Sequence, residues 1–173
     1  MEVKVLIECM DTERLLLRKV ASADAKSLWA IWSDPAVTKF MNISTFTNEE
    51  QVLEMIKLLN QLANEHTAIR YSIIEKTDNN IVGSCGFNNV DFDNATAEIG
   101  YDLAKTHWGK GYATEAIIAL IDVAFTHLEM TTIVAKVDAA NINSIKVLQK
   151  LNFTLQGYDS IEENLQVYVL CKG

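Results

Sequence analysis

The sequence predicts a mixed α/β (α+β) fold, with a mostly antiparallel sheet, a central pair of parallel strands and flanking helices. In the first hundred residues, short runs of apolar and β-branched residues are separated by polar turns, as in an antiparallel meander. After Thr96 a strand pattern, a long helix pattern and a second strand pattern follow one another, which indicates a right-handed crossover between parallel strands. The length of 173 residues suits a single domain spanning 1–173.

The N-terminal part is expected to form a strand followed by a helix. The strand is Arg14–Val20, and the helix begins near Ser22, where Ser and Asp favour a helix N-terminus. Asp34-Pro35 should end this helix, because the residue before a proline disfavours helical backbone. Apolar residues recur at helical spacing at Ala25, Leu28, Trp29 and Trp32.

A second helix and a hairpin are expected next. Thr47 and Glu50 have the spacing of a capping box, and Val52, Met55, Ile56, Leu59 and Leu62 form an apolar face behind them. Strand patterns then cover Ala68–Glu75 and Ile81–Asn88, and the polar turn between them predicts a hairpin. Another turn leads into the strand Thr96–Leu103.

The rest of the chain alternates between helices and strands. A long amphipathic helix is predicted over Gly111–Leu128, followed by the β-branched strand Thr131–Val137 and the helix Asn141–Leu151. Asn152 is a plausible left-handed residue at the end of that helix. The last two strands expected are Phe153–Tyr158 and Leu165–Cys171.

Composition and charge exclude several classes of protein. The chain has 49% hydrophobic and 22% charged residues, which is typical of a globular protein, and a formal net charge of −8. Because such a protein repels a polyphosphate backbone, we expect no direct nucleic-acid binding. No apolar run is long enough to cross a membrane, so no membrane association is expected.

The cysteines and histidines do not suggest a disulfide framework or a metal site. Cys9, Cys85 and Cys171 are odd in number and widely spaced, and the histidines lack metal-ligand spacing. Cys85 and Cys171 lie in apolar strand patterns and are expected to be buried thiols. Acidic residues interrupt the short apolar run at the start, so no signal peptide is predicted, and the expected location is cytoplasmic.

The segment Trp108–Thr114 is the most informative for function. It joins a strand to a helix, and Gly109 and Gly111 let a ligand approach the backbone closely. The N–H groups of a first helical turn have no intrahelical acceptors and face an anion at the positive end of the helix dipole, as a pyrophosphate requires. The pattern is neither a P-loop nor a dinucleotide fingerprint. On its own, the segment is also compatible with a tight connection that binds nothing.

This segment resembles the acetyl-CoA loop of the GNAT superfamily of N-acetyltransferases. The resemblance is carried by A-E-I-G-Y-D-L followed by W-G-K-G-Y-A-T-E-A. The superfamily pattern is Arg/Gln-x-x-Gly-x-Gly/Ala; here its first position is Trp108, and Gly111 and Ala113 match. The Trp variant is characteristic of the ribosomal-protein N-terminal (Rim-type) acetyltransferases.

Other pieces of the chain resemble the same subfamily in order and spacing. They are T-E-R-L-L-L-R at 12–18, S-D-P at 33–35, I-V-G-S-C-G-F at 81–87, and N-I-N-S at 141–144 followed by K-L-N-F at 150–153. The resemblance therefore covers most of the chain. It implies a GNAT domain whose two parallel strands splay apart around the pantetheine arm of acetyl-CoA.

The resemblance also implies the donor-binding residues, with acetyl-CoA as co-substrate and no metal. A β-bulge is expected near Gly100–Asp102. Asn141 either ties its helix to the pantetheine or the splayed strand, or is a plain N-cap, and Lys110 either contacts a phosphate or is solvated. The expected cofactor-binding residues are Tyr101, Leu103, Trp108, Gly109, Lys110, Gly111, Tyr112, Ala113, Thr114, Asn141 and Ser144.

Glu98 and Ser144 are the catalytic candidates for direct attack of an amine on the thioester in a ternary complex. Glu98 is either the base, acting through a water, or a group that only binds the acceptor amine. Where the superfamily often has a tyrosine, seven residues after Asn141, this chain has Leu148. The departure moves the role of thiolate partner to Ser144, whose alternatives are a helix cap or a pantetheine contact.

The acceptor is the least determined part of the site. The resemblance points to Phe40, Asn42 and Glu98 as acceptor-binding residues, within a segment that shapes this side of the site. The implied acceptor is the N-terminal α-amine of a protein, possibly ribosomal. The alternatives are a small amine (a polyamine, amino sugar or aminoglycoside) or a non-catalytic acyl-CoA-binding module. Monomer and homodimer both stay open.

Overall fold

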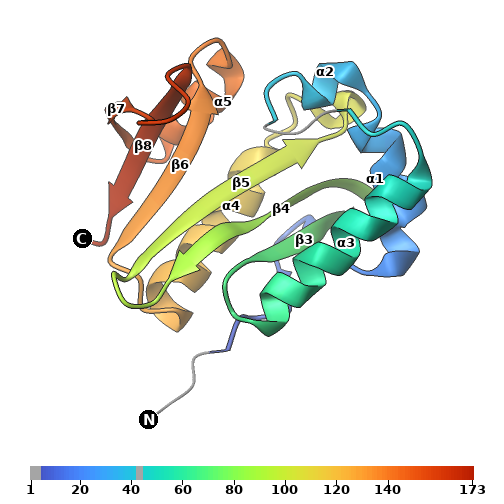
Figure 1. Cartoon of the computed structure of the whole chain (residues 1–173), viewed down its shortest axis with the longest axis horizontal. Coiled ribbons are helices and arrows are strands. Elements are labelled where there is room, and N and C mark those ends of the chain that lie inside the picture. Colours follow the sequence, from blue (N-terminus) through green and yellow to red (C-terminus); the bar gives the residue numbers. More distant parts are fainter. Residues whose placement is uncertain (1–4, 42–44) are drawn as a thin grey trace.

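A computed structural model describes residues 5–41 and 45–173 and shows one eight-stranded sheet with helices on both faces (Figure 1). The strand order is β1-β2-β3-β4-β5-β6-β8-β7. The strands are β1 (Cys9–Asp11), β2 (Leu15–Lys19), β3 (Ile69–Glu75), β4 (Asn80–Asp91), β5 (Thr96–Leu103), β6 (Thr132–Asp138), β7 (Thr154–Tyr158) and β8 (Leu165–Cys171). The predicted fold class is therefore confirmed, including the antiparallel hairpin of β3 and β4.

The helices form two layers. The helical elements are η1 (Ser22–Asp24), α1 (Ala25–Trp32), α2 (Pro35–Thr38), α3 (Glu49–Asn64), η2 (Lys105–His107), α4 (Tyr112–Asp122), the π-helical segment η3 (Val123–His127) and α5 (Ile142–Lys150). Helices α1 and α3 cover one face of the sheet, and α4 covers the other (Figure 1). Each layer encloses its own group of buried apolar side chains. In the described residues, no helix is both long and apolar enough to cross a bilayer.

The parallel strands β5 and β6 separate part-way along their length. They pair only from Thr96–Ile99 against Thr132–Ala135. Beyond that point β5 continues beside β4, and β6 continues beside β8. The expected splayed pair is thus present, and the facing backbone edges of the two strands are unpaired with each other beyond Ile99 and Ala135.

The predicted β-bulge was placed on the wrong strand. Gly100 to Leu103 of β5 pair in unbroken register with Gly86 to Gly83 of β4. The register shift that defines the bulge instead lies between Phe87 and Asn89 of β4. There Asn88 is the extra residue, opposite Ile99 and Glu98 of β5. A bulge re-aims the side chain at its own position, and here that side chain is Asn88.

Several local predictions need correction. Asn48 caps α3, because its side chain accepts from the backbone N–H of Gln51; Thr47 instead bonds the Gln51 side chain. Asp34-Pro35 ends α1 but also begins α2, with Asp34 as cap and proline in the first turn, where it is tolerated. The predicted long helix becomes π-helical after Asp122. Asn152 has the expected positive φ, +71°.

The cysteines differ in exposure. Cys85 is fully buried beneath the sheet, and burial raises the pKa of its thiol to about 12. Cys171 is exposed, so its predicted burial is wrong. Cys171 is the last residue of β8. The apolar pattern of the sequence continues to this end of the strand, but the packing that buries the sheet does not reach it.

Candidate active site

A first cavity, of about 440 Å³, lies between the loop 108–114, the end of β5 and the start of α5. Its lining includes most of the residues expected to bind the cofactor: Tyr101, Leu103, Trp108, Gly109, Gly111, Tyr112, Ala113, Thr114, Asn141 and Ser144. Lys110 is not among the lining residues, whereas Lys146 of α5 is. The cavity thus combines a helix N-terminus with one lysine.

The loop takes its shape from two glycines. Gly109 and Gly111 have φ of +76° and +81°, in the left-handed region that favours glycine. Gly111 is the N-cap of α4, and no side chain caps that helix end, so the first-turn N–H groups are available to a ligand. The Trp108 indole donates to the carbonyl of Leu103 (2.9 Å), which fastens the loop to the end of β5.

A second cavity, of about 490 Å³, opens on the α1–α3 side and continues through the gap between β5 and β6. Its apolar wall includes Trp32, Phe46, Met55, Leu59 and Leu62. Met55, Leu59 and Leu62 were predicted on the inward face of their helix and are only half-buried, because they line this cavity. Phe40 lies in its wall, while Asn42 falls outside the described residues.

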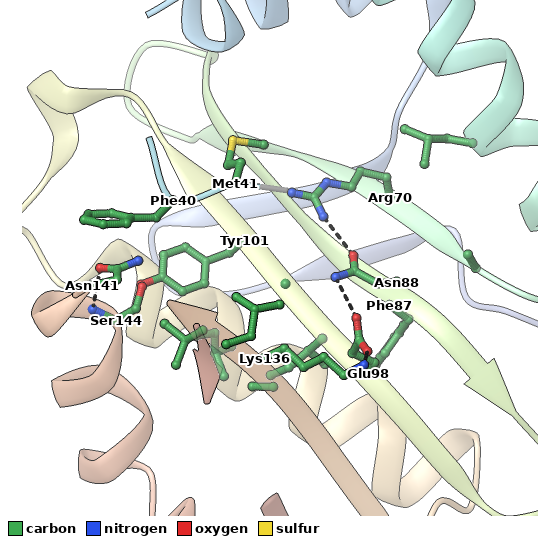
Figure 2. A pocket seen from close by; sticks show the side chains of 18 of the residues that line it. Phe40, Met41, Arg70, Phe87, Asn88, Glu98, Tyr101, Lys136, Asn141 and Ser144 are labelled. Atoms are coloured by element: carbon green, nitrogen blue, oxygen red, sulfur yellow. Dashed lines mark hydrogen bonds and ion pairs between the residues drawn. The ribbon is translucent and has the colours of Figure 1, made fainter. Parts of the chain in front are cut away.

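The two cavities meet at a pair of hydroxyl groups. Phe40, Met41, Tyr101, Asn141 and Ser144 line both cavities. The Tyr101 hydroxyl and Ser144 Oγ are 2.6 Å apart, and Figure 2 shows the Tyr101 side chain pointing from β5 toward Ser144 at the start of α5. Burial raises the pKa of Tyr101, and the hydrogen bond between Tyr101 and Ser144 offsets this only in part, so the phenol is protonated at neutral pH.

Asn141 supports Ser144 from the preceding turn. Its side chain accepts from the backbone N–H of Ser144 (3.3 Å) and caps α5. Because Asn141 also lines both cavities, capping and ligand contact are compatible roles at this position. The cap fixes the first turn of α5, which carries Ser144 to the junction.

A chain of polar side chains crosses the floor of the second cavity (Figure 2). Arg70 Nη1 donates to Asn88 Oδ1 (3.2 Å), and Asn88 Nδ2 donates to Glu98 Oε2 (3.3 Å). A Cβ on Gly100 would lie 2.7 Å from Asn88 Nδ2, so this glycine leaves the room that Asn88 needs. At the far end, Lys136 Nζ is 3.6 Å from Glu98 Oε1.

Each end of this chain is held by a further carboxylate. Arg70 pairs with the buried Asp102 (2.8 Å), which also accepts from the Trp32 indole (3.2 Å). Lys136 pairs with Asp159 (3.1 Å) in the segment that joins β7 to β8. The bond to Asp159 and the charge of Glu98 raise the pKa of Lys136, so it stays cationic. Among the described residues, the carboxylates that line this cavity are Glu98, Asp159 and Glu162.

Comparison with known proteins identifies this architecture. Residues 14–154 match the family model described as "Acetyltransferase (GNAT) domain". The chain belongs to the GNAT family. It is 50% identical over 151 residues to the uncharacterized N-acetyltransferase p20 of Bacillus licheniformis, covering 87% of this chain and 85% of the relative. It is 30% identical over 148 residues to the uncharacterized N-acetyltransferase YoaA of Bacillus subtilis (strain 168), covering 86% and 84%.

Solved GNAT structures share the fold. RimL, a ribosomal L7/L12 alpha-N-protein acetyltransferase solved in complex with coenzyme A, superposes with a TM-score of 0.86 at 21% identity, covering 95% of this chain and 98% of that chain. The GNAT family uses acetyl-CoA, and this chain is accordingly an acetyl-CoA-dependent N-acetyltransferase. Its acceptor amine is not fixed by the family.

Sequence reasoning missed several residues of this GNAT site. Tyr101 is expected from the sequence only as a cofactor-binding residue, with no role for its phenol, although it lies on β5, the strand that precedes the loop. Asp159 and Glu162 lie in a polar turn without a motif, so nothing in the sequence marked them. Arg70, Asn88 and Lys136 come from three different strands, and only the sheet register brings them together.

Proposed function

We propose that this GNAT enzyme transfers the acetyl group of acetyl-CoA to the N-terminal α-amine of a protein. The donor lies in the cavity of the loop 108–114, and the acceptor enters from the α1–α3 side. The observation that carries the proposal is the meeting of the two cavities at Tyr101 and Ser144. A thioester placed there is open to an amine from one side and continuous with its CoA on the other.

The donor half rests on backbone chemistry. The pyrophosphate accepts from N–H groups of the loop and the first turn of α4, where the helix dipole favours an anion. Lys146 adds a positive charge at the rim. The pantetheine arm lies between β5 and β6 and bonds the backbone near Tyr101 and Leu103, whose edge β6 leaves unpaired.

The hydroxyl pair supplies a proton to the leaving group. The amine nitrogen bonds to the carbonyl carbon, the carbon–sulfur bond breaks, and the sulfur leaves as a thiolate. Ser144 donates its proton to that sulfur and recovers one from the Tyr101 phenol, which is protonated at neutral pH and in hydrogen-bond contact. The nitrogen loses a second proton as the amide forms, and this proton passes through solvent to restore the Tyr101 phenol. Tyr101 thereby fills the role of the phenol that Leu148 does not provide.

Glu98 receives the proton of the incoming ammonium through a water molecule. Its carboxylate lies on the acceptor side, and Asn88 and Lys136 hold both oxygens in place. Because the acceptor α-amine has an ordinary pKa of about 8, a base is needed at neutral pH to make it nucleophilic. Lys136 cannot take that role, since its pKa is raised and it stays protonated.

The acceptor cavity supports a protein N-terminus through its mixed lining. The apolar wall of Trp32, Phe46 and Leu59 suits the side chain of a first residue, while the carboxylates suit its ammonium group. The carboxylates Glu98, Asp159 and Glu162 also support a second candidate, a small di- or polyamine. Lys136 weakens that second candidate, because it already neutralises part of this charge.

A panel of acceptors tests the proposed function. Release of free CoA from acetyl-CoA is measured with peptides that bear free N-termini, with the same peptides blocked at the N-terminus, and with spermidine and an aminoglycoside. We expect turnover with the free peptides and none with the blocked ones, even when these contain lysine. Turnover confined to the small amines would replace the protein acceptor with the second candidate.

A further inference from the structure

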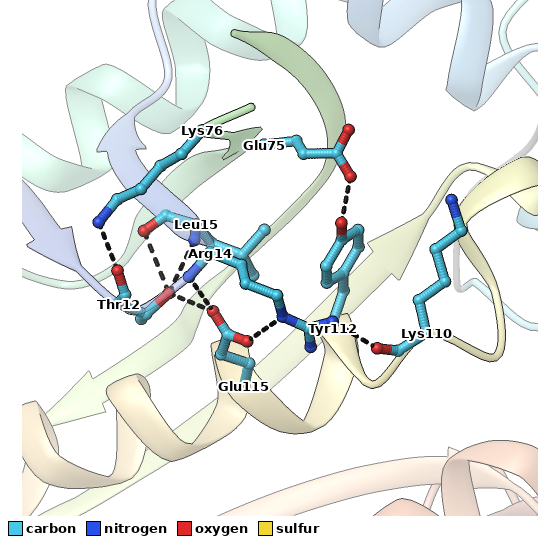
Figure 3. Close-up of polar contacts among 8 residues, drawn as sticks. All are labelled: Thr12, Arg14, Leu15, Glu75, Lys76, Lys110, Tyr112 and Glu115. Atoms are coloured by element: carbon cyan, nitrogen blue, oxygen red, sulfur yellow. Dashed lines mark hydrogen bonds and ion pairs between the residues drawn. The ribbon is translucent and has the colours of Figure 1, made fainter. Parts of the chain in front are cut away.

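Arg14, at the position just before β2, contacts the loop 108–114 from outside the donor cavity (Figure 3). Its Nη1 donates to the carbonyl of Lys110 (2.8 Å), and its Nε donates to Glu115 Oε1 (2.7 Å). A Cβ on Gly111 would lie 3.3 Å from Arg14 Nη2. The guanidinium therefore spans the loop and the first turn of α4, although Arg14 itself does not line the cavity.

Glu115, the partner of Arg14 on α4, is bound by several hydrogen bonds. Glu115 Oε2 accepts from the backbone N–H of Arg14 (2.9 Å) and from the Thr12 hydroxyl, so two residues of the N-terminal segment bind one carboxylate. Burial opposes ionisation of Glu115, but the hydrogen bonds from Thr12 and Arg14 prevail and lower its pKa. A charged, three-donor contact of this kind fixes the start of α4 relative to the sheet.

Tyr112 adds a second attachment beneath the loop. The Arg14 guanidinium lies 4.4 Å from the centre of its ring, on the ring face. The Tyr112 hydroxyl donates to the buried Glu75 of β3. Arg14 and Tyr112 thus tie the loop to the segment that leads into β2 and to the end of β3.

The bond to the Lys110 carbonyl has a directional consequence for the next residue. In a planar trans peptide, the carbonyl and the following N–H point in opposite directions. Turning the Lys110 carbonyl toward Arg14 therefore turns the Gly111 N–H away from it, toward the cavity that Gly111 lines. We infer that Arg14 is a positioning residue for the donor: it orients the Gly111 N–H and the first turn of α4 to receive the pyrophosphate of acetyl-CoA.

This inference rests on the proposed role of the loop as the pyrophosphate site, and the test separates the two. Arg14→Lys keeps the charge but cannot bond both Glu115 and the Lys110 carbonyl in the planar fork of arginine. The matched control is Arg18→Lys: Arg18 lies on β2, is about as exposed (37% against 42%), and pairs with Asp24 at 2.8 Å, away from the loop. Glu115→Gln serves as a second variant of the same contact.

The donors are acetyl-CoA and S-acetyl-pantetheine, which lacks the pyrophosphate. For Arg14→Lys we expect about a ten-fold weaker affinity for CoA and a matching rise in KM for acetyl-CoA, as for the loss of one charge-assisted bond. The value of kcat at saturating acetyl-CoA and the kcat/KM for S-acetyl-pantetheine should stay within about two-fold of wild type. Glu115→Gln should repeat this donor-specific pattern, and Arg18→Lys should match wild type with both donors.

Two results would overturn the inference and locate its failure. In the first, wild type binds CoA more tightly than pantetheine, and Arg14→Lys either keeps that preference in full or loses the same factor in kcat/KM with both acetyl donors. Arg14 then has only a structural role. If wild type binds CoA and pantetheine equally well, the loop is not the pyrophosphate site, and the role of the loop fails together with the inference.

Discussion

Replacing Glu98 by Gln is expected to lower kcat/KM for the acceptor by about 10²–10³ at pH 7, the usual contribution of a positioned base. The amide keeps the size of the side chain and its contact with Asn88 but accepts no proton. The loss should shrink as the pH rises above the pKa of the acceptor amine, because the amine is then already neutral. The measurement is a pH profile of kcat/KM for wild type and variant, with Glu54→Gln on the exposed side of α3 as control.

The same profile separates a base from a group that only binds the amine. If Glu98 only orients the acceptor, Glu98→Gln raises the acceptor KM and leaves kcat nearly unchanged, since the proton transfer is intact. If the ratio of kcat/KM between wild type and Glu98→Gln does not change between pH 7 and 10, the result would contradict the role of Glu98 as a base.

Replacing Tyr101 by Phe or Ser144 by Ala is expected to lower kcat by about 10²-fold, with little change in KM for either substrate. The two hydroxyls are 2.6 Å apart and form one proton path, so removing either should disable the path. The double variant should then be little worse than the more damaged single variant, because residues that act as a unit are not additive.

A buried tyrosine outside the junction provides the control. Tyr168 of β8 is buried, and its hydroxyl bonds the Gln166 side chain (3.1 Å), so Tyr168→Phe removes a comparable hydroxyl. Its kcat should stay close to that of wild type, because Tyr168 lines neither of the two cavities. If the effects of Tyr101→Phe and Ser144→Ala multiply in the double variant, the two hydroxyls act independently.

Much of this fold is predictable because its signals are local. Apolar runs bounded by polar turns predicted the hairpin of β3 and β4. The strand–helix–strand pattern after Thr96 predicted the parallel pairing of β5 with β6. Gly109 and Gly111 predicted the loop, because left-handed backbone favours glycine and can therefore be recognised from the residue type. The position of the bulge was not predictable in this way, because it depends on the register of two strands. From the sequence, Asn88 is the last residue of a predicted strand, whereas β4 continues to Asp91.

The grouping of the candidate site residues around the cavities was predictable only where one segment carries them. The loop 108–114 and Ser144 each lie in a recognisable motif, whereas the floor of the acceptor cavity joins side chains from β3, β4, β5, β6 and the β7–β8 turn. Arg14 illustrates the same limit. Its sequence neighbours indicate a strand, and its partner Glu115 is 101 residues away. Such contacts follow from the packing of the whole sheet against α4.

The central proposal is that one continuous path joins the CoA loop, the hydroxyl pair and the acceptor cavity. A bisubstrate conjugate, with CoA linked through an acetyl bridge to the α-amine of the best peptide acceptor, tests it directly by its dissociation constant. We expect the conjugate to bind about 10²–10⁴-fold more tightly than CoA, because two linked ligands fill both cavities at once. A conjugate that binds no more tightly than CoA alone would contradict the proposal that the two cavities form one active site.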